Sequence, residues 1–146
     1  MFTVYNIILY LHIFSVILVI GPIFILFPLL NKLKYQVENQ ESELELIRFV
    51  LRLSEYAGRV LIIMGILLIW LGGWKWLESW IVMAVLLLIC AIIFMERIFS
   101  PAIRKIESEE EESRIILINK LKQYVIYYIS ILLIAMWFMI QKPVLW

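Results

Sequence analysis

Long apolar runs separated by shorter polar segments make up most of this chain. Four of the runs approach the length of about 20 mostly apolar residues that a helix needs to cross a bilayer. They cover residues 4–30, 57–71, 80–95 and 124–140. Hydrocarbon offers no water to the backbone, so each span should be helical. The pattern predicts an all-α protein, a single membrane domain over residues 1–146 built as a four-transmembrane-helix bundle.

The polar segments between the spans carry helix signals of their own. Ser42 and Glu45 have the spacing of a capping box, which predicts a helix that continues into the second span. Ser108 and the acidic run 109–112 predict another helix start before the fourth span. Ser100-Pro101 predicts a break or a fresh start after the third span. We therefore expect helices that extend beyond the bilayer.

Small residues recur at seven-residue intervals in the two central spans. In lipid, helices associate closely where small residues keep one face flat. We therefore expect the second and third spans to pack tightly together along these positions. They are Gly58, Gly65 and Gly72 in the second span, and Ala84 and Ala91 in the third. Pro22 and Pro28 should kink the first span.

Composition agrees with a membrane location. Hydrophobic residues make up 64% of the chain, against roughly 45–50% in soluble domains. The net charge of +1 suggests no nucleic-acid partner, and a single cysteine excludes an intrachain disulfide.

Eleven of the thirteen basic residues follow the first or the third span. By the positive-inside rule both of these segments are cytoplasmic. This predicts an up-down, multi-pass protein of the cell inner (cytoplasmic) membrane, with the N- and C-termini outside. All six tryptophans fall on the predicted outer side, as an aromatic belt or as the wall of a flat ligand's pocket.

His12 is the only histidine and lies within the first span, with Tyr10 and Ser15 nearby. An intramembrane ionisable residue is a functional candidate by default. A neutral imidazole either bonds between helices or ligates haem iron. One histidine per chain means that haem b would need a second ligand from another residue, a second copy or a partner subunit.

Glu55 and Arg59 are four residues apart, and Glu96 is expected at the same depth. They predict an ion-pair cluster at the inner interface, or alternatively a gate. The sequence contains no complete catalytic motif and no metal-ligand spacing, so an enzyme is not favoured.

Leu11-His12-Ile13 followed by Gly21-Pro22, with Lys142-Pro143 near the end, resembles several bacterial membrane families. They are an uncharacterised four-helix integral membrane protein family, the copper-resistance D type, and the four-helix haem-containing protoporphyrinogen oxidase type. The oxidase resemblance implies haem binding by His12 and a lysine shortly after a tryptophan in the third span. Ala84 stands at that place, so the resemblance is closer to the uncharacterised branch.

The function expected from these features is haem binding through His12, or an accessory role near respiratory or metal-handling machinery. One alternative is a small structural subunit of a larger membrane complex. The other is a protoporphyrinogen oxidase-like enzyme, which the missing lysine disfavours. The expected partners are the lipid bilayer and either further copies of the chain, as a homo-oligomer, or a partner membrane subunit.

Overall fold

A computed structural model describes residues 3–35, 38, 40–108 and 110–146. The described elements are all helical, and four long helices are apolar enough to cross a membrane. They are α1 (Val4–Tyr35), α2 (Gln40–Leu71), α3 (Ser79–Phe94) continued by the π-helical turn η1 (Met95–Phe99) and α4 (Ser100–Ile106), and α5 (Glu111–Gln141). Each predicted span lies within one of these long helices.

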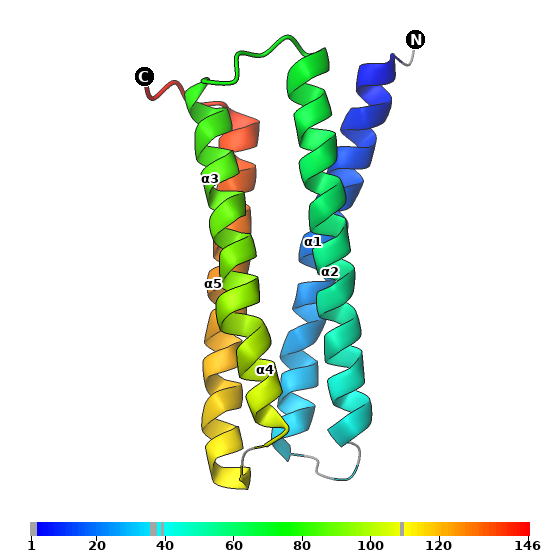
Figure 1. Ribbon diagram of the computed structural model, residues 1–146, viewed down its shortest axis with the longest axis vertical. Coiled ribbons are helices and arrows are strands. Elements are labelled where there is room, and N and C mark those ends of the chain that lie inside the picture. The colour runs from blue at the N-terminus through cyan, green and yellow to red at the C-terminus, as the bar shows by residue number, and fades with distance from the viewer. Residues whose placement is uncertain (1–2, 36–37, 39, 109) are drawn as a thin grey trace.

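The helices form two hairpins that lie side by side (Figure 1). One hairpin packs α1 against α2, the other packs α3 against α5, and the contact between α1 and α5 joins them. Among the described residues, no Cα atom of α2 comes within 8 Å of one in α3. The expectation that the second and third spans pack together is therefore wrong. Ala84 and Ala91 are buried, but the helix along which α3 packs is α5.

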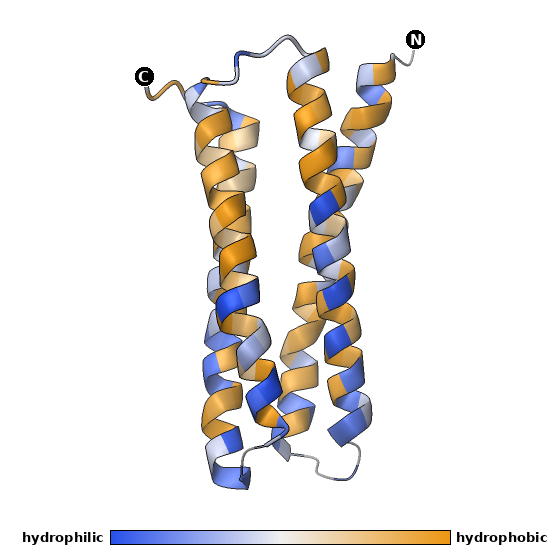
Figure 2. Ribbon diagram, in the orientation of Figure 1, coloured by the Kyte–Doolittle hydropathy of each residue, from blue (hydrophilic) through white to orange (hydrophobic). Residues whose placement is uncertain are grey.

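The start of α1, the C-terminal tail and the 72–78 loop lie at one end of the bundle, which we call the terminal end (Figure 1). The end of α1, the start of α2, the end of α4 and the start of α5 lie at the opposite end (Figure 1). Polar residues gather toward that opposite end, which we call the charged end, while the terminal half is largely apolar (Figure 2).

The core is a continuous apolar stripe between the two hairpins. In α1 its members recur every three or four residues, which places them on one side of the helix. They are Val19, Ile23, Leu26, Leu30 and Leu33. Facing residues of α5 include Leu121 and Val125 in the same buried cluster. The other sides of these helices also expose apolar residues, as lipid-facing helices do.

Helix α1 passes through both prolines without ending. Pro22 has no N–H and leaves the carbonyl of Leu18, four residues earlier, without its usual helical donor. At the next residue the Ser54 hydroxyl of α2 donates a 2.9 Å hydrogen bond to the Val19 carbonyl. Ser54 is buried, so this bond satisfies polar atoms far from water.

Of the two outcomes predicted at Ser100-Pro101, the break does not occur, because α4 follows η1 directly, whereas a fresh α-helical start does, because α4 begins at Ser100 with Pro101 in its first turn. Pro101 cannot donate to the carbonyl of Arg97, and its ring would crowd that carbonyl. A wider π-helical turn immediately before the proline separates these groups and lets the helix continue.

The two helices predicted to extend the second and fourth spans are confirmed, because α2 begins at Gln40 and α5 at Glu111. The predicted serine caps are wrong. Ser42 lies inside α2, two residues after its first residue, so it does not cap that helix. The Ser108 hydroxyl donates to the Lys105 carbonyl at the end of α4 instead of capping α5. In the acidic run, Glu109 lies outside the described residues, and α5 begins at Glu111.

We expect Ser54→Ala to lower the free energy of unfolding by about 1 kcal/mol, because it removes a buried bond between α1 and α2. Ser130→Ala is the matched control, since the Ser130 hydroxyl is exposed and bonds only the Ile126 carbonyl of its own helix. Its change should stay within about 0.5 kcal/mol. Reversible unfolding in mixed detergent micelles measures both, and equal losses would contradict the assigned role of Ser54.

Candidate functional site

His12 lies between α1 and α2 and is only 9% exposed. Its imidazole packs on Gly65, where an added Cβ would stand 3.4 Å from Cε1 and 3.8 Å from Nδ1 of the ring. Gly65, a member of the predicted small-residue seam, therefore lies against a side chain of α1 and not against α3.

The imidazole also lies close to the backbone of Leu61. Leu61 precedes Gly65 by one helical turn, so both residues face the imidazole from the same side of α2. The Nδ1 atom is buried and has no hydrogen-bond partner within the described part of the chain. His12 thus packs α1 against α2, and its Nδ1 atom stays available to bind a ligand.

Ser15 and Tyr10, the two residues predicted to lie near His12, differ from each other in burial. Ser15 is buried, and its hydroxyl donates a 2.8 Å bond to the Leu11 carbonyl of its own helix. Tyr10 is 63% exposed. The buried surroundings of His12 come instead from Leu61 and Gly65 of α2.

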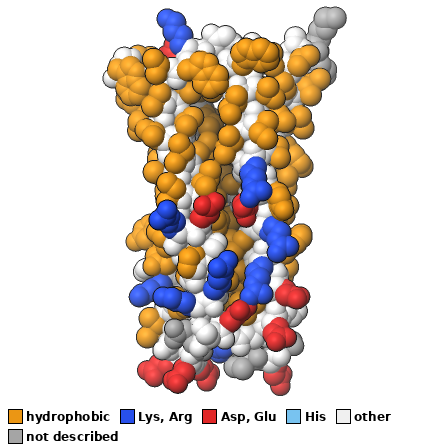
Figure 3. All heavy atoms as spheres, viewed as in Figure 1, with side chains coloured by type: hydrophobic (Ala, Val, Ile, Leu, Met, Phe, Trp, Pro, Cys, Tyr) orange, Lys and Arg blue, Asp and Glu red, His pale blue; other side chains and the backbone are white. Residues whose placement is uncertain are grey.

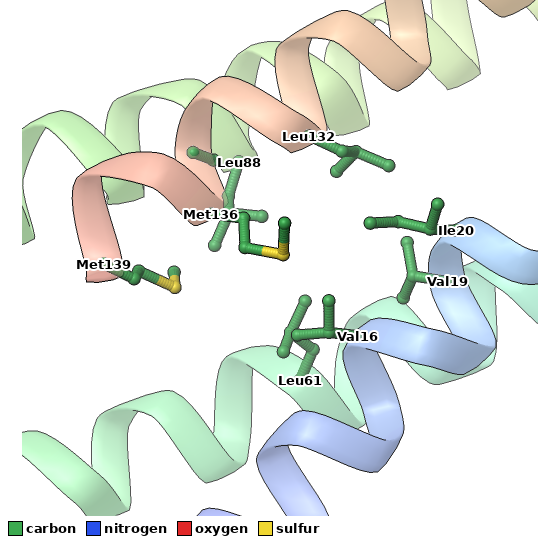
Figure 4. A pocket seen from close by; sticks show the side chains of 9 residues that line it. Val16, Val19, Ile20, Leu61, Leu88, Leu132, Met136 and Met139 are labelled. Atoms are coloured by element: carbon green, nitrogen blue, oxygen red, sulfur yellow. The ribbon is translucent and has the colours of Figure 1, made fainter. Parts of the chain in front are cut away.

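A narrow apolar cavity lies one turn deeper in the bundle (Figure 4). All four long helices line it, and Leu61 connects it to the surroundings of His12. The lining residues are Val16, Val19, Ile20, Leu61, Leu88, Leu132, Ala135, Met136 and Met139. The space able to hold a water molecule is only about 20 Å³.

These dimensions test whether haem fits. Small-molecule sites usually enclose about 300 Å³ or more, far above the space in this cavity. The His12 ring also lies against Gly65, with helix backbone where a macrocycle would stand. The unpartnered Nδ1 suits a ligand, but the residues around it do not fit haem in this arrangement of the helices.

Charged side chains form a broad band across α2 and the third long helix, from mid-height toward the charged end (Figure 3). Arg59 pairs with Glu55 at 2.6 Å, as their spacing predicted. Glu96 is exposed and forms no ion pair with any described residue, so the expected three-residue cluster is not assembled. Instead, an ion pair between Arg48 and Glu107 joins α2 to the residue after α4.

The aromatic cluster at the terminal end holds the C-terminal tail. The Lys142 ammonium lies 4.3 Å from the centre of the Trp74 ring and 5.3 Å from that of Trp80, in cation–π contact with both. The Ser79 hydroxyl donates to the Pro143 carbonyl and accepts from the Leu145 amide. Trp74 and Trp80 therefore help to hold the C-terminal tail of the chain against the bundle.

An uncovered apolar stripe follows the length of α2. Its eight members alternate three and four residues apart, the spacing of helices that pack in pairs. This α2 stripe consists of Leu46, Phe49, Leu53, Tyr56, Val60, Ile63, Leu67 and Trp70. Six members are exposed and Leu53 and Leu67 are half-exposed, so none lies in the bundle's own core.

Comparison with protein-family models, with curated sequences and with solved structures finds no match to this chain. Within the described residues, no three His, Cys, Asp or Glu side chains are grouped to hold a metal ion. The His12 contact and the α2 stripe are therefore the two candidate functional features of the described chain.

Sequence reasoning missed several of these contacts. The 3-4 spacing of the α2 stripe is visible in the sequence, but only the fold shows that the stripe has no partner. Ser54 gave no signal, because a serine inside a helix most often bonds its own backbone. The contacts of Lys142 and Ser79 depend on the path of the C-terminal tail, which the sequence does not show.

Gly65 and Gly58 form a matched pair for testing the His12 contact. Alanine is favoured over glycine inside a helix by about 0.5–1 kcal/mol, and an added Cβ at Gly58 meets no atom within 4 Å. Gly58→Ala should therefore raise the free energy of unfolding. Gly65→Ala should also raise the free energy of unfolding, because its methyl meets the imidazole at ordinary van der Waals distance, and unlike Gly58→Ala it should shift the ring resonances of His12. A loss of stability, or unchanged His12 resonances, would contradict this packing.

Proposed function

We propose that the protein is a non-catalytic structural or accessory subunit of a membrane assembly, and that the α2 stripe is a surface through which it associates with another helix. The observation that carries this proposal is an apolar stripe of helix-pairing spacing that no element of the described chain covers. A structural or accessory role needs such a surface and needs no reacting groups.

Part of the stripe lies at a depth that hydrocarbon does not cover. The exposed charges of Glu55 and Arg59 mark this level on α2, since charged side chains are costly within the bilayer. Leu46 and Phe49 lie two to three turns further toward the charged end and are exposed there. Burying one such side chain contributes about 1.5–3 kcal/mol, which favours a partner helix over lipid.

The orientation of the protein in the membrane is part of the same proposal. Eleven of the thirteen basic residues lie in the polar segments of the charged half, which favours a cytoplasmic charged end. Both termini are then outside, in an up-down protein of the cytoplasmic membrane. The resemblance of the first span favours respiratory or metal-handling machinery as the setting.

Haem binding through His12 is the second candidate. The buried, unpartnered Nδ1 atom supports it, because a neutral imidazole nitrogen is a haem ligand. The narrow space beside the ring opposes it, so haem would require the hairpins to part. The protoporphyrinogen oxidase alternative is weaker still, since buried Ala84 stands where that resemblance implies a lysine.

A photo-reactive benzoyl-phenylalanine at Phe49 should cross-link the chain to protein in native membranes. The same residue at Ile116 is the control, because Ile116 is an exposed apolar residue of α5 away from the stripe. We expect protein adducts at Phe49 at several times the yield at Ile116. Adducts with lipid alone, or equal yields at both positions, would contradict docking through α2.

An absorption spectrum tests the haem candidate. Protein purified from haem-replete native membranes should be colourless if the accessory role alone applies, because the cavity near His12 has no room for a macrocycle. A Soret band that His12→Ala removes, in a variant that still folds, would establish the second candidate. A Soret band that survives in this variant would place haem elsewhere.

A further inference from the structure

We propose that the partner covering the α2 stripe is the α2 helix of a second copy of this chain, so that the two copies form a parallel twofold dimer. This inference rests on the docking role proposed above and names the occupant. The observation that supports it is the α2 stripe of eight apolar positions, which charged residues of both signs border.

The length of the stripe restricts the partner. Leu46 and Trp70 are 24 residues apart, so the stripe extends over about 36 Å at 1.5 Å per residue. The hydrocarbon core is only about 30 Å thick. A covering helix must therefore cross the bilayer and continue as an apolar-faced helix on the side of the charged end. Helix α2 itself meets both requirements without interruption from Gln40 to Leu71.

Membrane orientation restricts how two copies can meet. Copies inserted the same way have parallel α2 helices, related by a twofold axis along the membrane normal. Identical positions of the stripe then meet in register, apolar against apolar at every level. Phe49 would face Phe49 and Tyr56 would face Tyr56, pairs that add aromatic contact to the buried area.

The bordering charges are compatible with this pairing. Glu45, Arg52 and Arg59 recur every seven residues along one edge of the stripe. In a parallel pair, such identical edge positions lie on opposite sides of the seam. Like charges therefore do not meet. The other edge carries Val50 and Ala57, which are apolar and already buried in their own bundle.

Disulfide trapping in native membranes tests the register. In a Cys90→Ser background, which removes the only native cysteine, Tyr56→Cys and Phe49→Cys should each give a disulfide-linked dimer on mild oxidation. A disulfide needs Cα atoms within about 7 Å, which facing positions of a parallel pair provide. Glu55→Cys is the control, since it is exposed at the same level but lies off the stripe.

Subunit counting tests the energetics independently. Wild-type protein in lipid nanodiscs should contain two copies, while Phe49→Glu should dissociate at a concentration at least about tenfold higher. Phe49 is exposed in the single chain, so this variant should keep its helical fold, as circular dichroism can verify. Ile116→Glu, an equivalent change away from the stripe, should remain dimeric.

The two proposals fail in different ways. Cross-linking of Phe49 to a different protein, without self-disulfides at Phe49 or Tyr56, would overturn the dimer and leave the accessory role standing. Equal disulfide yields at Glu55→Cys and Tyr56→Cys would also overturn the dimer, because they indicate random collision. Adducts with lipid alone would remove both proposals.

Discussion

The contact of α1 with α5 is the packing on which the bundle depends, because these two helices alone pack along one another across the two hairpins in the described chain. In hydrocarbon, apolar burial gives no driving force between helices, so close packing and internal satisfaction of polar atoms must hold them. Ser54 illustrates the second requirement by bonding the Val19 carbonyl beside the proline turn of α1. The core stripe of α1 and α5 provides the close packing.

The His12 contact has the same physical origin. A buried imidazole must pack closely, and α2 approaches it at Gly65, which has no side chain, and at the backbone of Leu61. This makes His12 first a link between helices. Its remaining nitrogen, unpartnered and buried, keeps a ligand role open as a candidate, although the neighbouring cavity is too narrow for a macrocycle.

Because α3 packs along α5 and not α2, one flank of α2 has no neighbour among the described residues. The α2 stripe lies on exposed surface and continues toward the charged end of the bundle. Assembly with another helix would complete the bundle at this place. The dimer proposed above uses the same helix on both sides, with charged residues on one edge and the chain's own core on the other.

The sequence by itself determined that the protein is helical and has four potential spans, because the length and apolarity of a span depend only on consecutive residues. It also determined the Glu55–Arg59 pair, which is local to one helix turn. Which helices pack together was decided only in three dimensions. Glycines and alanines mark a face that permits close approach but do not name the neighbour, so Gly65 turned out to accommodate His12 of α1. The tertiary structure likewise decided that the α2 stripe stays uncovered, since burial depends on where every other helix lies.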